Sequence, residues 1–272
     1  MWRVLTVLLL AGVCAGAGAA PAVHDVVTVG IGESFLIDSA ILHETRRINV
    51  AIPRGAGGVA LPVLYMPDGG LDEDFLHVAG LLQVGAGNGT TRPFLLVGIE
   101  NTERRRDLTG PTANAKDRAI APRVGGSAAF RRFIREELMP EVARRYRITT
   151  ERAIVGESFA GLFVMETLAL APEMFDTYIA IDPSLWWNDG ALARTLDSTL
   201  AAPGFAYAPA KTLAVATSRD GSLSVDLAAR FPHVPGLRFS YRAWPEEGHG
   251  TVYHPAALAA FRVVLRPLDA AR

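Results

Sequence analysis

Ser158 has the neighbours that a nucleophilic serine requires. An apolar segment at residues 153–155 precedes it, and an apolar segment with helix-forming residues follows it at 162–168. Small residues stand two positions before and two positions after it, at Gly156 and Ala160, where a tight strand-to-helix turn brings backbone close. Alanine at the second position departs by one methyl group from the usual glycine. The pattern predicts a nucleophile elbow, which exposes a serine hydroxyl for acyl transfer.

His249 is the histidine best placed to serve as the base. It lies in the glycine-containing segment 246–250, after the last expected strand and before the last expected helix. In the architecture that carries such elbows, the triad runs along the chain as nucleophile, acid and base. His233 and His254 also follow Ser158, but they stand beside helices rather than in an open loop. A neutral imidazole can take the proton of a serine hydroxyl at physiological pH.

The acid that would orient His249 has several candidates. Asp220 follows the expected strand at 212–217, where a carboxylate is expected in this order of residues. Asp226 could serve if the intervening loop folds back, and Glu247 is close to the histidine in sequence. The sequence favours Asp220 slightly over Asp226. A Ser–His pair without a strong acid is the remaining alternative.

An oxyanion formed at Ser158 would need backbone donors. The residue after the nucleophile, Phe159, is expected to supply one N–H. The second should come from the loop at 67–71, whose two glycines permit the amides to turn inward. Within this loop, Gly70 or Leu71 is the expected donor.

Apolar runs that could be buried strands alternate along the chain with longer helical patterns. This alternation predicts an α/β fold with a mostly parallel central sheet and helices on both faces. Reactive groups of such sheets gather at the carboxyl ends of the strands. The expected strands are 34–41, 46–52, 61–66, 93–99, 152–155, 178–181, 212–217 and 238–243, and the expected helices are 72–83, 128–146, 161–170, 191–200, 225–231 and 255–265.

Composition limits the classes of function. The chain has 272 residues, half of them hydrophobic, which suits one domain with a large core. A net charge of -1 argues against a nucleic-acid partner, because phosphate binding needs a concentrated positive surface. The histidines lack metal-ligand spacing, so neither a metal nor an organic cofactor is expected. The oligomeric state cannot be deduced from the sequence.

The first 19 residues have the features of a signal peptide. Arg3 provides the positive start, residues 4–13 the apolar run, and residues 15–19 the small side chains that a signal peptidase accepts. Residues 20–272 are then expected to form a single domain in the periplasm or outside the cell. The apolar run is too short for stable membrane insertion. A lipid anchor on Cys14, the only cysteine, is the less favoured alternative because Val13 precedes it.

Five ordered segments resemble the α/β-hydrolase esterases related to the trilactone siderophore esterases and, more distantly, to esterase D. This resemblance implies an esterase that uses Ser158 and His249, with Phe159 and the 69–70 loop as oxyanion donors. It also implies that the segment 104–109, which contains Arg106, and the pair Trp186 and Trp187 line the approach to the site. Glu157 departs from the family, which often has histidine there. The five segments are 64–69, 97–109, 133–140, 156–162 and 182–188.

Two other functions remain open from the sequence. A catalytically degenerate binding protein would keep the cleft and use Ser158 structurally. An acyltransferase would pass the acyl group to an alcohol rather than to water. The reaction expected from the motifs is hydrolysis of a small-molecule ester, of siderophore type or another type, through an acyl-enzyme on Ser158.

Overall fold

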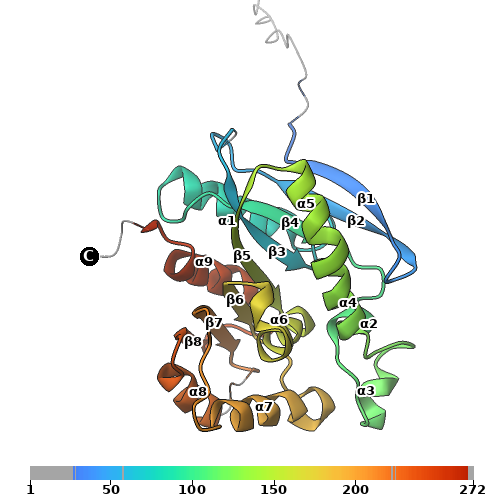
Figure 1. The fold of residues 1–272 in the computed structure, drawn as a ribbon, viewed down its shortest axis with the longest axis vertical. Helices are drawn as coiled ribbons and strands as arrows, with labels where there is room; N and C mark the ends of the chain where they lie inside the picture. Colours follow the sequence, from blue (N-terminus) through green and yellow to red (C-terminus); the bar gives the residue numbers. More distant parts are fainter. Residues whose placement is uncertain (1–26, 28, 57, 222, 224, 269–272) are drawn as a thin grey trace, which may run out of the picture. The chain divides into compact units, whose positions relative to one another are not determined.

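In the part of the chain that the structure describes, eight strands form one sheet (Figure 1). This computed structural model describes residues 27, 29–56, 58–221, 223 and 225–268. The chain divides into two units, residues 1–31 and residues 32–272, and all elements of regular structure described here belong to the second. The predicted signal peptide at 1–19, with Cys14, lies outside the described residues.

The sheet is mostly parallel, as the sequence predicts. Its order is β1-β2-β4-β3-β5-β6-β7-β8. The first two strands form an antiparallel pair, β2 also runs antiparallel to β4, and all other neighbours are parallel. The strands are β1 Glu33–Ser39, β2 Glu44–Ala51, β3 Leu61–Pro67, β4 Leu95–Ile99, β5 Ile148–Glu157, β6 Thr177–Ile181, β7 Lys211–Ser218 and β8 Leu237–Trp244.

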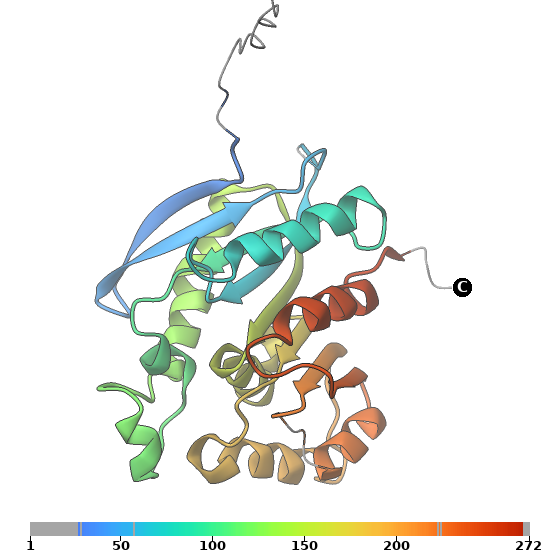
Figure 2. The same cartoon turned by 180° about the vertical axis from the view of Figure 1, so that it is seen from behind.

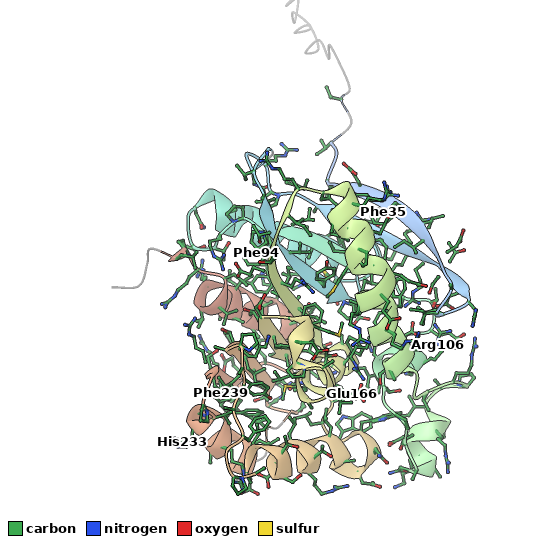
Figure 3. All side chains as sticks on the ribbon, in the orientation of Figure 1. Phe35, Phe94, Arg106, Glu166, His233 and Phe239 are labelled. Atoms are coloured by element: carbon green, nitrogen blue, oxygen red, sulfur yellow. The ribbon has the colours of Figure 1, made fainter. Side chains whose placement is uncertain are left out.

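Helices cover both faces of this sheet. Figure 1 shows α4, α5 and α6 in front of the sheet, and Figure 2, seen from behind, shows α1 and α9 in front of it. One buried cluster joins α1 and α9 to the sheet and includes Phe94 (labelled in Figure 3). The other cluster packs helices α4, α5, α6, α7 and α8 against the opposite face of the sheet. The helices are α1 Phe75–Gly87, α2 Arg104–Leu108, α3 Ala115–Ala119, α4 Ser127–Phe133, α5 Met139–Arg145, α6 Phe159–Leu170, α7 Trp187–Leu200, α8 Val225–Arg230 and α9 Tyr253–Val264, with short turns η1 Ile134–Leu138, η2 Pro172–Met174 and η3 Phe231–His233.

All eight predicted strands are present, with ends shifted by a few residues. Strands β3, β4 and β6 are buried along their whole length, which explains their unbroken apolar sequences. The helix predicted at 128–146 is instead divided into α4, the π-helical turn η1 and α5. Pro140 lies at the start of α5 and cannot donate its backbone nitrogen to the preceding turn. No described helix is long and apolar enough to span a bilayer.

Candidate active site

Ser158 occupies a strained turn between β5 and α6. Its φ and ψ of 61° and -119° lie where side chains other than glycine are uncommon. Three backbone hydrogen bonds hold this conformation. The Ser158 N–H donates to the Ile181 oxygen at 3.0 Å, and the Ser158 oxygen accepts from Leu162 at 2.9 Å and from Ser184 at 3.1 Å. The predicted elbow is therefore present, and adjoining strand β6 helps to fix it.

Close backbone contacts explain the small residues around the turn. A Cβ on Gly156 would lie 2.6 Å from the carbonyl group of Ala160. A Cβ on Gly161 would lie 2.9 Å from the oxygen of Ile181, where α6 crosses the end of β6. Ala160 itself is fully buried and fits because Gly156 leaves room for its methyl group. The departure from glycine at Ala160 thus does not disrupt the elbow.

His249 contacts Ser158, as the sequence predicts. It lies in the loop between β8 and α9, and its Nε2 is 3.0 Å from the Ser158 Oγ. Nδ1, the other ring nitrogen, is 2.6 Å from the Oδ2 of Asp182. A carboxylate on Nδ1 favours the tautomer whose Nε2 is free to accept the serine proton. The three side chains form a continuous hydrogen-bonded chain.

Asp182 therefore takes the position that the sequence analysis assigned to Asp220 or Asp226. It follows β6 and its side chain is almost fully buried, whereas the Asp220 side chain is 57% exposed. The Asp220 carboxylate accepts the backbone N–H of His249 at 3.1 Å and does not meet the ring. Asp226 is exposed in the first turn of α8. The prediction of either residue as the partner of the imidazole is wrong, because the carboxylate that meets the ring follows the neighbouring strand β6.

The end of β7 and the loop that follows it support the buried Asp182 carboxylate. The Ser218 N–H donates to Asp182 Oδ1 at 2.9 Å, and the Ser218 hydroxyl donates to Oδ2 at 2.7 Å. Such donors stabilise an ionised carboxylate away from water. A Cβ on Gly221 would lie 1.7 Å from Oδ1, so only glycine leaves the carboxylate its place. The segment that was predicted to supply the acid therefore positions Asp182, the acid that follows the neighbouring strand β6.

A cavity of about 570 Å³ opens beside the Ser158 hydroxyl. Trp186 lines it and is 55% exposed, in agreement with its predicted position at the approach. Trp187 is buried instead, and its indole N–H donates to the Gly110 oxygen at 2.9 Å. Both indoles pack against the ring of Phe159. The lining residues are Ser158, Phe159, Asp182, Pro183, Ser184, Leu185, Trp186, Ala193, Asp220, Gly221 and His249.

Arg106 does not reach this cavity. Its guanidinium (Arg106 is labelled in Figure 3) pairs with Glu44 at 2.7 Å and with Asp107 at 2.6 Å. The side chain lines a separate hollow beside α2. The structure corrects the prediction that this side chain lines the approach to Ser158. Arg104 comes closer, because its guanidinium lies over the ring of Phe159 and holds Asp68 through two bonds of 2.6 and 2.8 Å.

The structure distinguishes the two amides, Gly70 and Leu71, that the sequence offered as the second oxyanion donor. The Gly70 N–H donates to the Glu73 carboxylate at 2.6 Å, so it is not available to an oxyanion in this conformation. The Leu71 N–H meets no acceptor among the described residues. Phe159 begins α6, and the first amides of a helix have no intrahelical acceptor. Of the predicted donors, Phe159 and Leu71 are thus the two whose amides stay available.

The alternative histidines lie away from the serine. His233 is exposed in η3 beside α8 (Figure 3). His254 stacks against His77 with ring centroids 4.8 Å apart, and burial lowers the pKa of His77 to about 4. Ligand atoms of Glu157, Asp182 and His249 lie within 4.8 Å of one another. The contacts of these atoms are hydrogen bonds and ion pairs of the Ser158 chain, so they explain the cluster without a metal.

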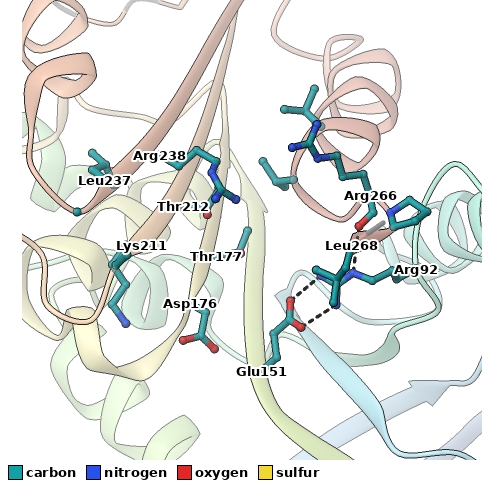
Figure 4. A pocket seen from close by; sticks show the side chains of 15 residues that line it. Arg92, Glu151, Asp176, Thr177, Lys211, Thr212, Leu237, Arg238, Arg266 and Leu268 are labelled. Atoms are coloured by element: carbon teal, nitrogen blue, oxygen red, sulfur yellow. Dashed lines mark hydrogen bonds and ion pairs between the residues drawn. The ribbon is translucent and has the colours of Figure 1, made fainter. Parts of the chain in front are cut away.

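A second cavity, of about 640 Å³, lies at the opposite edge of the sheet (Figure 4). It is formed around the first residues of β6, β7 and β8 and includes the ion pair of Arg92 with Glu151. Its described lining contains no serine, cysteine or histidine. The chemistry of a serine hydrolase therefore belongs to the smaller cavity, at the carboxyl ends of the strands.

Comparison with known proteins agrees with this site. Residues 39–232 match the family model Esterase, described as Putative esterase. The ferri-bacillibactin esterase BesA of Bacillus subtilis is 33% identical over 199 residues, which are 68% of this chain and 67% of that protein. A siderophore triacetylfusarinine C esterase of Aspergillus fumigatus is 34% identical over 139 residues, 47% of this chain and 46% of that protein.

A solved structure has the same fold as this chain. The IroE-like serine hydrolase from Shewanella oneidensis superimposes with a TM-score of 0.74 at 28% identity, covering 86% of this chain and 80% of that one. The predicted α/β-hydrolase fold is thereby confirmed. The chain belongs to the Esterase family, and it is a serine hydrolase that acts on carboxylic esters.

Proposed function

We propose that the chain hydrolyses esters through a covalent acyl-enzyme on Ser158, with His249 as general base and Asp182 as the acid that orients it. One observation carries this proposal, the continuous chain from the Ser158 Oγ through the imidazole to the buried carboxylate. The distances of 3.0 and 2.6 Å are those of a proton-transfer path. The strained turn holds the hydroxyl at the mouth of the cavity.

The reaction consists of two acyl transfers. The Ser158 Oγ attacks the ester carbonyl while His249 takes its proton, and collapse of the tetrahedral intermediate breaks the bond to the alcohol. The imidazolium returns the proton to the departing alkoxide. A water molecule, activated by the same nitrogen, then attacks the acyl-enzyme and releases the carboxylic acid. His249 is neutral again at the end of each half-reaction.

The oxyanion of each intermediate would be held by backbone amides. Phe159 is the first donor, since it follows the nucleophile at the start of α6. Leu71 is the second donor that we propose, because the amide of Gly70 is occupied by Glu73. The amino end of α6, to which the Phe159 amide belongs, adds a positive electrostatic field at the oxyanion.

The substrate that we propose is a small-molecule ester of siderophore type. The relatives named as ferri-bacillibactin and triacetylfusarinine C esterases support this class. The cavity of about 570 Å³ has room for an acyl group of moderate size, and the exposed face of Trp186 offers an aromatic surface for it. The reaction needs no cofactor.

A labelling and turnover experiment tests the proposed function. The purified protein is expected to hydrolyse short p-nitrophenyl esters and to react with a fluorophosphonate probe at one site, located by peptide mass at Ser158. Added alcohols should raise the yield of transesterified product only in proportion to their concentration relative to water. Neither turnover nor labelling would indicate a degenerate binding protein, and strong preference for an alcohol acceptor would indicate an acyltransferase.

We also propose export of the chain to the periplasm or the exterior of the cell. The support is the order of charge, apolar run and small residues in the first 19 positions. N-terminal sequencing of the protein from an expressing bacterium is expected to start after Ala17 or Ala19. A start at Cys14 with a bound lipid would indicate an anchored protein, and a start at Met1 would contradict export.

A further inference from the structure

Glu157 is a second carboxylate beside the His249 ring, and it lies at the reacting nitrogen. It is the last residue of β5, directly before Ser158. Its Oε1 lies 3.4 Å from the His249 Nε2, the nitrogen that is 3.0 Å from the Ser158 Oγ. Asp182 binds the opposite ring nitrogen. The imidazole therefore faces one carboxylate at each nitrogen, and the mechanism described above uses only one of them.

The surroundings of Glu157 leave its negative charge only partly screened and not neutralised by an arginine. Its side chain is 16% exposed, so water screens it only in part. Arg104 is nearby, but its guanidinium is engaged by two bonds to Asp68. Among the described residues, His249 is the one basic group within ion-pair distance of Glu157. The groups that face this carboxylate are His249 from the loop before α9, Arg104 from α2, Asp68 from the turn after β3, Asp182 from the turn after β6 and Tyr253 from α9.

Resting on the proposed function, we infer that Glu157 is a positioning residue for the same reaction, which stabilises the imidazolium formed when His249 takes the Ser158 proton. The proton on Nε2 then has two oxygen neighbours, the developing substrate oxygen and the Glu157 carboxylate. An opposite charge at this distance favours the charged form of the ring. In each half-reaction, the ionised carboxylate lowers the barrier of the step in which His249 takes a proton.

The charge of the Glu157 carboxylate changes near neutral pH. Burial raises the pKa of Glu157 to about 7, while the charges of His249 and Arg104 oppose that rise. Protonation of Glu157 removes the charge that assists the imidazolium. The acid limb of the pH–rate profile is then expected to include the protonation of Glu157. Two effects therefore follow from loss of the carboxylate: a lower maximal rate, and an acid limb whose midpoint lies at lower pH.

The test is a pH–rate profile of Glu157→Gln with a p-nitrophenyl ester, with enzyme concentration set by fluorophosphonate titration. We expect kcat at the plateau to fall about tenfold with KM changed by less than about twofold, since one pKa unit of ring stabilisation corresponds to a factor of ten. The midpoint of the acid limb should move about one unit to lower pH. Glu157→Asp, which keeps the charge at a greater distance, should give intermediate values for both.

Glu246→Gln is the matched control. It removes an equal charge from an exposed side chain on the same loop as His249, and it should leave kcat and the midpoint unchanged. A Glu157→Gln enzyme with the wild-type midpoint and kcat would overturn the inference, and so would an equal shift in the control. If Ser158→Ala also kept full activity, the proposed function itself would fail. If Glu157→Gln does not react with the fluorophosphonate, the test uses Glu157→Asp. An acid-limb midpoint of Glu157→Asp equal to that of the wild type would then overturn the inference.

Discussion

Ser158→Ala is expected to lower kcat by about 10⁴-fold or more and to abolish labelling by a fluorophosphonate. The hydroxyl that would attack the substrate carbonyl is removed, while the turn that carries it is retained because its three hydrogen bonds are made by the backbone. Residual turnover should come only from the oxyanion donors and from binding of the ester. The measurement is kcat and KM for p-nitrophenyl acetate, with the labelled fraction determined by mass spectrometry.

Ser198→Ala is the control for this change. Ser198 is exposed on α7, and its hydroxyl donates to the Thr195 oxygen within the same helix. Loss of this hydroxyl should alter kcat by less than about twofold, as expected for surface substitutions. Activity of Ser158→Ala close to that of the wild type would contradict the acyl-enzyme mechanism. Labelling that persists in Ser158→Ala would mean that another nucleophile reacts with the probe.

The strands could be predicted because their burial shows in local sequence. Strands that are covered on both faces, such as β3 and β6, carry uninterrupted apolar residues. The helices α2 and α3 were not predicted, because a helix of five residues is too short to show a hydrophobic period. Arg104–Leu108 is instead fixed by ion pairs with residues distant in sequence, such as that of Arg106 with Glu44. Local patterns contain no information on such partners.

The nucleophile and the base could be predicted for a similar reason. A tight turn demands small residues at fixed spacing, and a base after the last strand has few competitors. The second oxyanion donor depends on whether Glu73 folds back onto Gly70, which spacing does not reveal. The contact of Glu157 with His249 joins residues far apart in sequence, and only the departure of Glu157 from the family pattern drew attention to it.

The carboxylate that orients His249 could be predicted only in part from the rule that reactive groups gather at the carboxyl ends of the strands. Parallel strands β6 and β7 are neighbours, so the loops that follow them reach the same edge of the sheet. Each loop carries an aspartate there, Asp182 and Asp220. Position along the chain cannot tell which of the two meets the imidazole. Burial decides it, because Asp182 lies beneath the ring with donors from Ser218, while Asp220 stays at the surface.

Asp182→Asn is accordingly expected to lower kcat by about 10⁴-fold, whereas Asp220→Asn should cost no more than about tenfold. An amide in place of the carboxylate can donate to Nδ1, which favours the tautomer with a proton on Nε2, and that nitrogen can then no longer accept from Ser158. Asp220→Asn keeps an oxygen for the His249 N–H and leaves both ring nitrogens unchanged. The measurement is kcat/KM on one p-nitrophenyl ester for both variants.

Asp226→Asn completes the comparison, since this exposed carboxylate on α8 should tolerate the change without loss of rate. Thermal melting of each variant separates loss of catalysis from loss of fold, because Asp182 also anchors the loop after β7 through Ser218. If Asp220→Asn proved the more damaging change in a folded protein, the imidazole would have to turn from Asp182 to Asp220 during turnover. The buried carboxylate would then support the loop rather than the base.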